Sequence, residues 1–204
     1  NVPRPFCLTI SRMTVRQALS QMESEGLIVR QKGRGTFVAG HKIVQNNIKS
    51  FSESVRDRGM VPSARVLYFK KERVSEDITG ILNFSRDELF YIVKRLRCAN
   101  DIPVGLEEVF IPAQFCPELE KFSLDASLYQ LINVQYGISI VFMDHIIEAS
   151  TASAEEKKLL GIGSSMPVLK VSGVCYISGG RKFSYERDVY RGDQFSFNAR
   201  IHLN

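Results

Sequence analysis

The stretch that decides the amino-terminal fold reads Ser11-Arg-Met-Thr-Val-Arg-Gln-Ala-Leu19, and then Glu25-Gly-Leu-Ile-Val-Arg-Gln-Lys-Gly-Arg-Gly-Thr-Phe-Val38. Its first part predicts a helix, because apolar residues recur at the spacing of one helical face. These residues are Val15, Ala18, Leu19 and Met22. Ser11 is a suitable N-cap, and Gly26 suits the left-handed position after the last turn. We expect the apolar face to pack on a core and the opposite face to remain free.

The second part of the stretch predicts a hairpin with strands at residues 27–30 and 36–39. The connection places Lys32 and Arg34 at the tip, between glycines that permit positive φ. A short basic helix followed by such a hairpin suits duplex DNA. The helix fills the major groove, and the hairpin reaches the minor groove or the phosphates. Taken singly, each piece is more typical of a solvated surface.

Length and composition indicate a globular chain. It has 204 residues, 44% hydrophobic and 24% charged, and its net charge of +5 mildly favours a polyanion as partner. The cysteines lack CxxC spacing and predict buried thiols in a reducing compartment, while the histidines stand apart and predict no metal site. They are Cys7, Cys98, Cys116, Cys175, His41, His145 and His202. Without an apolar run or a signal peptide, a cytoplasmic location is expected and no membrane partner.

Beyond the hairpin, residues 41–49 are polar and aperiodic, which predicts a linker. Residues 50–204 alternate strands and helices. Helices are predicted at residues 50–59, 75–82, 124–136 and 153–160, and strands at 63–69, 89–98, 103–111, 138–148, 167–177, 182–190 and 194–203. Because neighbouring strands are joined by hairpins, the pattern predicts an α+β domain on a largely antiparallel sheet.

Residues 11–38 resemble the winged helix-turn-helix of the GntR family of bacterial transcription regulators. The resemblance implies that DNA is contacted by a recognition helix and a wing, through Ser11, Arg12, Thr14, Arg16, Gln17, Lys32, Gly33, Arg34, Gly35 and Thr36. Family members begin with further helices before this segment. Here Pro3 and Pro5 disfavour a helix in residues 1–10. We therefore expect residues 1–40 to form an incomplete winged helix-turn-helix domain.

The rest of the chain carries a second set of motifs. They are Ser50-Phe51, Arg58-Gly59-Met60, Arg95-Leu-Arg97, Ile102-Pro103, Glu107, Ile111-Pro112, Ser127-Leu-Tyr129, Tyr136-Gly137 and Tyr190-Arg-Gly-Asp193. Together they resemble the UTRA effector-binding domain, of chorismate-lyase-like fold, found in the HutC subfamily of GntR regulators. The nearest likeness is to regulators of amino-sugar utilisation, which respond to phosphorylated sugars such as N-acetylglucosamine 6-phosphate. It implies a homodimer that needs no cofactor and binds operator DNA and a small anionic effector.

The residues support an anionic effector independently. Arg95 and Arg97 are two apart on one predicted strand, so both guanidinium groups project to the same side and suit a phosphate. The alternative to a phosphate site is that the two arginines form an exposed charged stripe on the sheet. Ser50 and Ser127, each near a helix start, offer hydroxyls and backbone amides to the same anion, and the resemblance adds Phe51.

The sugar end of the effector is predicted less directly. Glu107 suits sugar hydroxyls, but a three-residue loop sets it opposite Arg95, whereas a two-residue turn sends it to the other face. Tyr129 and Tyr190 suit a sugar ring and equally suit a core. Amino-sugar regulators usually carry a glutamate at the position of Ser184, so the resemblance leaves room here for a different sugar phosphate.

These observations favour a dimeric, ligand-responsive transcriptional repressor. The alternative is a small-molecule-binding module whose DNA-binding part is degenerate. An enzyme is not expected, because the sequence shows no Ser-His-Asp order, metal cluster or paired catalytic carboxylates.

Overall fold

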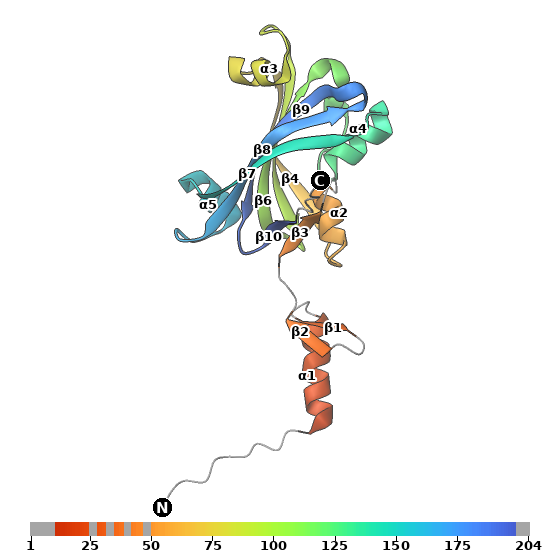
Figure 1. Cartoon of the computed structure of the whole chain (residues 1–204), viewed down its shortest axis with the longest axis vertical. Helices are drawn as coiled ribbons and strands as arrows, with labels where there is room; N and C mark the ends of the chain where they lie inside the picture. The colour runs from red at the N-terminus through yellow and green to blue at the C-terminus, as the bar shows by residue number, and fades with distance from the viewer. Residues whose placement is uncertain (1–10, 25–27, 32–34, 39–41, 47–49, 199–204) are drawn as a thin grey trace, which may run out of the picture. The chain divides into compact units, whose positions relative to one another are not determined.

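The computed structural model describes residues 11–24, 28–31, 35–38, 42–46 and 50–198 (Figure 1). Its contacts divide the chain into a smaller unit, residues 1–42, and a larger unit, residues 43–204. Each unit has its own secondary structure. Among the described helices, none combines the length and the apolar character that crossing a membrane requires.

The smaller unit consists of one helix and one hairpin. Helix α1 (Arg12–Ser24) is followed by β1 (Ile28–Gln31) and β2 (Gly35–Val38), which pair antiparallel. The predicted N-cap is confirmed, because the Thr14 backbone N–H donates to Ser11 Oγ at 3.1 Å. The predicted strands are confirmed to within one residue at each described end.

The apolar face predicted for α1 is exposed in the described part of this unit. Val15 and Met22 are 46% and 39% exposed, and Leu19 is half-buried. An amphipathic helix buries its apolar stripe only where another element packs on it. The prediction of a packed face is therefore wrong within the described residues. The predicted cap Gly26 and the hairpin tip, Lys32, Gly33 and Arg34, lie outside them.

The larger unit is built on a six-stranded sheet of order β4-β5-β6-β9-β8-β7, and each neighbouring pair is antiparallel. Its strands are β4 (Pro62–Glu72), β5 (Phe90–Ala99), β6 (Ile102–Pro112), β7 (Phe142–Thr151), β8 (Pro167–Ile177) and β9 (Arg181–Arg191). Its helices are α2 (Phe51–Arg56), α3 (Glu76–Leu82), α4 (Leu128–Tyr136) and α5 (Ala154–Leu160), with 3₁₀ turns at Ala113–Phe115, Leu119–Lys121 and Ser178–Gly180. The predicted α+β class and antiparallel sheet are confirmed.

A strand lies within the predicted linker. β3 (Ile43–Asn46) pairs in parallel with β10 (Phe195–Asn198), and the Ile43 N–H donates to the Gln194 carbonyl at 2.6 Å. Ile43 and Phe195 are each 1% exposed, so this pair belongs to the core. The linker prediction is wrong over β3, because its hydrogen-bonding partner lies at the other end of the chain and no local pattern signals it.

Helix α4 begins later than predicted. Ser127 is its N-cap and accepts from the Gln130 N–H at 3.4 Å. The preceding carbonyls of Leu124 and Ala126 accept hydrogen bonds from Arg95 instead of from a helical turn. A tertiary contact thus holds residues 124–127 outside the helix that their apolar spacing predicted. Strand β7 likewise begins later than predicted.

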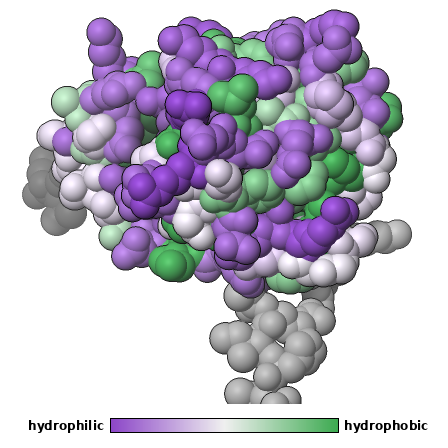
Figure 2. Space-filling model, turned by 90° about the horizontal axis from the view of Figure 1, so that it is seen from above, coloured by the Kyte–Doolittle hydropathy of each residue, from purple (hydrophilic) through white to green (hydrophobic). Residues whose placement is uncertain are grey.

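The centre of the sheet is buried on both faces. Ile132 of α4 packs with Val93 and Val109 on one face, and Leu160 of α5 packs with Leu96 on the other. Figure 1 shows α2 and α4 to one side of the sheet and α5 to the other. The outer face seen in Figure 2 is mostly hydrophilic, with scattered hydrophobic residues. Charged side chains at the centre of β5 and β6 must therefore find partners inside the protein.

We expect Gly105→Ala to lower the free energy of unfolding by about 1–3 kcal/mol, because it overpacks the core. A Cβ at Gly105 would lie 2.6 Å from Tyr190 Cδ1, and the Tyr190 ring is stacked on Phe195 at 4.0 Å and cannot yield freely. Urea denaturation measures the change. Gly80→Ala is the control, since its Cβ in α3 meets nothing within 4 Å, and it should be neutral or stabilising. Equal effects of the two changes would contradict the packing argument.

Candidate functional site

The sheet face beneath α2 and α4 carries charged side chains in register on neighbouring strands. Arg95 on β5 faces Glu107 on β6, and Glu107 faces Asp188 on β9. Arg97 lies two residues from Arg95 and therefore on the same face. All four side chains are buried. Burying so many charges is costly unless they are paired or hydrogen-bonded, so their contacts define what the site can bind.

A turn and a bulge together decide the direction in which Glu107 points. Of the two alternatives left by the sequence, the structure has the two-residue turn, Asn100-Asp101, with φ of 48° and 63°. β6 then carries an extra residue relative to β5 at Val104, a β-bulge. A one-residue shift reverses the face to which the following side chains point. The bulge therefore restores Glu107 to the position opposite Arg95.

Arg95 is committed to protein partners. Its Nε donates to Glu107 Oε2 at 2.6 Å, and its Nη2 contacts the same oxygen. Its Nη1 donates to the carbonyls of Leu124, at 2.9 Å, and Ala126, at 2.8 Å. Arg95 thus holds the segment before α4 against the sheet. Of the predicted phosphate clamp, Arg95 is thus already hydrogen-bonded to protein groups, and the exposed-stripe alternative is wrong for both arginines, which are buried.

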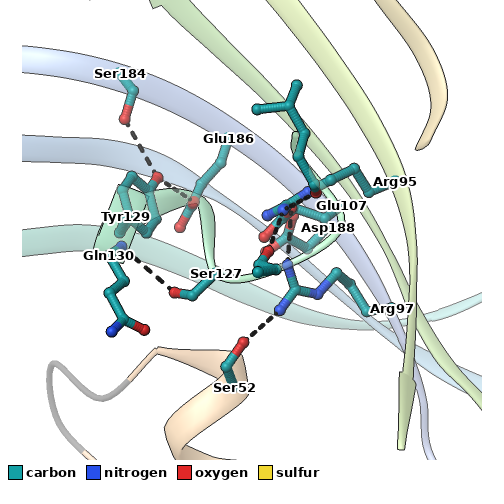
Figure 3. Close-up of polar contacts among 12 residues, drawn as sticks. Ser52, Arg95, Arg97, Glu107, Ser127, Tyr129, Gln130, Ser184, Glu186 and Asp188 are labelled. Carbon is teal, nitrogen blue, oxygen red and sulfur yellow. Dashed lines mark hydrogen bonds and ion pairs between the residues drawn. The ribbon is translucent and has the colours of Figure 1, made fainter. Parts of the chain in front are cut away.

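Arg97 retains hydrogen-bonding capacity. Its Nη2 donates to Ser52 Oγ at 2.9 Å, its Nη1 lies 3.7 Å from Glu107 Oε2, and its guanidinium carbon lies 4.6 Å from the centroid of the Phe51 ring. Its Nε is buried and has no hydrogen-bond partner within the described part of the chain. A buried donor without a partner costs free energy that an anionic ligand would recover. Figure 3 shows Arg97 between Ser52 and the charged side chains of the sheet.

An inner cavity of about 30 Å³ lies among these side chains, and an outer groove of about 410 Å³ adjoins it. The inner volume has room for water molecules, and the outer one is of the size that small ligands occupy. Every predicted effector residue except Ser184 lines the inner cavity, namely Ser50, Phe51, Arg95, Arg97, Glu107, Ser127, Tyr129 and Tyr190. Cavity and groove share Ser50, Ser127, Tyr129 and Met143. A ligand can therefore extend from one into the other.

Two helix starts meet at this cavity. Ser50 caps α2, where its Oγ accepts from the Glu53 N–H at 3.3 Å and donates to Glu53 Oε2 at 2.8 Å. Ser127 caps α4, where its Oγ accepts from the Gln130 N–H at 3.4 Å. The prediction that both serines stand at helix starts is confirmed. Both hydroxyls therefore lie on the boundary between the cavity and the outer groove.

Tyr129 connects α4 to the strands below it. Its hydroxyl donates to Glu186 Oε2 at 2.8 Å and lies 3.3 Å from Ser184 Oγ (Figure 3). It also lies 3.3 Å from Cys175 Sγ. Burial, together with Cys175 and Glu186, raises the pKa of Tyr129 well above its usual value. Ser184 contacts Tyr129, and Glu186, two residues further along this strand, lines the cavity.

Asp188 is a carboxyl group whose neutral form is favoured. Tyr190 donates to its Oδ2 at 3.0 Å, and its Oδ1 is buried without a hydrogen-bond partner among the residues described. Burial, and then the negative charges of Glu186 and Glu107, raise the pKa of Asp188 well above its usual value. Burial also acts to raise the pKa of Glu107, but Arg95 and its neighbouring arginine bring it below its usual value.

The sequence-based prediction missed several lining residues. Asp188 could have been predicted from the sequence, because strand alternation from Ser184 places residues 186, 188 and 190 on the same face of β9. Gln45 and Phe197 also line the cavity, and they come from the unpredicted β3 and from β10. His145 was set aside as isolated, yet it too lies in the cavity wall.

The residues predicted to contact DNA belong to the smaller unit. Those on α1 and at the start of β2 are exposed, as base or phosphate contacts require. They are Ser11, Arg12, Thr14, Arg16, Gln17, Gly35 and Thr36. The wing residues Lys32, Gly33 and Arg34 lie outside the described residues.

Comparison with known proteins fits this division into two units. A family model described as the UTRA domain matches residues 57–196, and one described as bacterial regulatory proteins, gntR family, matches residues 7–38. The chain is 38% identical over 190 residues to the HTH-type transcriptional repressor NagR of Bacillus subtilis (strain 168), covering 92% of this chain and 78% of that protein. The chain belongs to the GntR family of bacterial regulatory proteins.

More distant relatives of this GntR chain agree. It is 30% identical to the HTH-type transcriptional repressor PhnF of Mycolicibacterium smegmatis, over 95% of this chain and 79% of that protein. A crystal structure of PhnF from Mycobacterium smegmatis superposes with a TM-score of 0.77 at 29% identity, covering 96% of this chain and 87% of that one. The GntR chain is therefore a DNA-binding transcriptional regulator with a UTRA domain and not an enzyme, as predicted.

We expect Asp188→Asn to reduce the loss of stability of this GntR chain as pH rises. A carboxyl whose folded pKa is raised contributes stability that is present below its ordinary pKa of 3.8 and is lost at higher pH. Urea denaturation between about pH 4 and pH 8 should show the variant gaining on the wild type as pH rises.

Asp193→Asn is the control of opposite sign. Its hydrogen bond from Arg191 lowers the pKa of Asp193, so the wild-type carboxylate stabilises at high pH and this variant should lose stability there. Parallel pH profiles for wild type and Asp188→Asn would contradict the assignment of a neutral Asp188.

Proposed function

We propose that this GntR regulator is a homodimeric repressor of a sugar-utilisation operon, released from operator DNA by a phosphorylated sugar. The proposal of an anionic effector rests on Arg97. Its side chain is buried and lines the cavity, and its Nε has no hydrogen-bond partner among the described residues. Because DNA is its target in a bacterium, we place the protein in the cytoplasm.

The cavity has two chemically different regions, and a phosphorylated sugar has two matching ends. Arg97, with the hydroxyls of Ser50 and Ser127, suits a phosphate, since guanidinium forks and hydroxyls bind its oxygens. The carboxyl groups of Glu107 and Asp188 suit the hydroxyl or amino groups of a sugar, which donate hydrogen bonds. A purely anionic ligand would leave the buried Oδ1 of Asp188 without a hydrogen-bond donor among the described residues.

The sugar is proposed to differ from that of regulators with a glutamate at position 184. Ser184 is short and uncharged, and it contacts Tyr129. Glu186 occupies the neighbouring place on the same strand face and bonds to Tyr129 as well. The carboxylate nearest the sugar is therefore displaced along β9, which favours an amine-bearing or gluco-configured sugar phosphate.

Operator binding is assigned to the smaller unit. Arg12, Thr14, Arg16 and Gln17 are exposed on α1, which suits a helix lying in the major groove. The wing follows through β2, where Gly35 has a φ of 115°, a conformation that glycine adopts readily. Two copies of this unit in a dimer would read the two halves of a pseudo-palindromic operator.

Release requires that the effector favour one dimer geometry over the DNA-competent one. The ligand shifts the population only through a difference in affinity between the two states. The segment before α4, held by Arg95, and the capped start of α2 both border the cavity and are the elements best placed to respond. A coupling of a few kcal/mol is typical of such regulators.

We expect Arg97→Ala to weaken binding of glucosamine 6-phosphate or glucose 6-phosphate by about 10- to 100-fold, because charge-assisted hydrogen bonds to the phosphate are lost. Isothermal calorimetry on the full chain measures this. The matched control is Arg187→Ala, an arginine that packs over Phe110 and is not among the described residues that line the cavity. Equal affinities of the two variants for either sugar phosphate would remove Arg97 from the site.

We expect Arg16→Ala to lower affinity for operator DNA about tenfold while leaving sugar-phosphate binding unchanged, since the lost contact is in the smaller unit. Gel shifts with promoter fragments at fixed salt provide the measurement. Arg86→Ala, a 75% exposed arginine of the larger unit, is the control for lost charge. A wild-type affinity for the Arg16 variant would rule out α1 as the recognition helix.

A further inference from the structure

The wall of the cavity contains a cluster of which the regulator's proposed function uses only Glu186. His145 Nε2, Cys175 Sγ and a carboxylate oxygen of Glu186 all lie within 4.8 Å of one another. The residues come from β7, β8 and β9, three neighbouring strands of the sheet. In the sequence the three are far apart, so spacing alone predicted no metal site.

A glycine on the middle strand makes this meeting possible. In the register of the sheet, Gly173 on β8 lies between His145 on β7 and Glu186 on β9. A Cβ at Gly173 would lie 2.4 Å from the imidazole Cδ2 of His145 and 2.0 Å from the carbonyl oxygen of Asp144. Because Gly173 has no side chain, the ring can lie across β8 towards Glu186. Cys175 is two residues further along β8 and therefore shares this face.

The ligand atoms are close without being fully used by hydrogen bonds. His145 Nε2 lies 2.7 Å from Glu186 Oε1, yet this buried nitrogen has no partner of hydrogen-bond geometry among the described residues. Glu186 directs its other oxygen to Tyr129, which fixes the carboxylate. Cys175 is fully buried, with its sulfur 3.3 Å from the same tyrosine hydroxyl. The second contacts of Glu186 and Cys175 thus hold them in position, as outer-shell partners do in metal sites.

We propose that His145, Cys175 and Glu186 bind a divalent transition-metal ion of the Zn²⁺ class. Imidazole, thiolate and carboxylate together select Zn²⁺ or Co²⁺ over Mg²⁺ and Ca²⁺, which prefer oxygen ligands alone. Ions of this class take four ligands, so three protein donors leave one position, and His145 and Glu186 border the cavity. The thiol proton passes to solvent as the metal–sulfur bond forms. The open position then accepts water or an oxygen of a ligand in the cavity.

The test is a titration of the chelator-treated full chain with Co²⁺, followed by the near-ultraviolet charge-transfer absorption that a cobalt–thiolate bond produces. We expect one ion per chain. Cys175→Ser should abolish this absorption, whereas Cys116→Ser, which removes an equally buried thiol outside the cluster, should retain it. Zn²⁺ should displace the Co²⁺ and abolish the band.

Two further variants keep the test decisive if Cys175→Ser does not fold. His145→Gln and Glu186→Gln should each weaken Co²⁺ binding by about tenfold or more, as loss of metal ligands or their close partners does. Absorption that persists in Cys175→Ser, or unchanged affinity in both other variants, would mean an adventitious ion only and overturn the proposal. Absence of the band in the wild type would overturn it as well.

The metal site and the sugar-phosphate site can fail separately. Arg97→Ala leaves all three donors in place, so this variant should bind Co²⁺ with wild-type affinity even where it has lost the sugar phosphate. Loss of Co²⁺ binding in Arg97→Ala would contradict a site formed by these three side chains alone.

Discussion

One buried carboxylate, that of Glu107, organises the centre of the larger unit. It lies between two buried guanidinium groups, which would otherwise repel each other in an environment of low dielectric. Through Arg95 it reaches the carbonyls of Leu124 and Ala126, and so determines where α4 can begin. Through Arg97 it reaches Ser52 of α2. The helices that cover the cavity are therefore attached to the sheet by a single charged network.

The binding chemistry of the cavity follows from what this network leaves unused. Arg95 donates hydrogen bonds to Glu107 and to two backbone carbonyls, whereas the Nε of Arg97 has no partner among the described residues. Burial and the negative charges of Glu186 and Glu107 raise the pKa of Asp188 more than Tyr190 and Arg97 lower it, so its neutral form is favoured. The result is a cavity that can accept an anion at one place and offer carboxyl oxygens at another, which a sugar phosphate can satisfy at both ends.

Two glycines allow a side chain of the neighbouring strand to lie directly against the backbone of the sheet. Gly105 admits the ring of Tyr190, and Gly173 admits the ring of His145. In both cases a side chain on one strand occupies the space that a Cβ on its neighbour would fill. The same construction thus shapes the wall of the cavity at Tyr190 and brings the proposed metal ligands together around His145.

The sequence by itself determined the α+β class, the antiparallel sheet and the α1–hairpin unit, and it predicted half of the residues that line the cavity. Strand alternation and helix caps are local, so they can be read from neighbouring residues. Only the tertiary structure decided the orientation of Glu107. The two-residue turn alone would point Glu107 to the other face of the sheet, and the bulge at Val104 returns it to the face that carries Arg95. It also decided that β3 pairs with β10 and that His145 meets Cys175, since such partners are brought together only by the folded sheet.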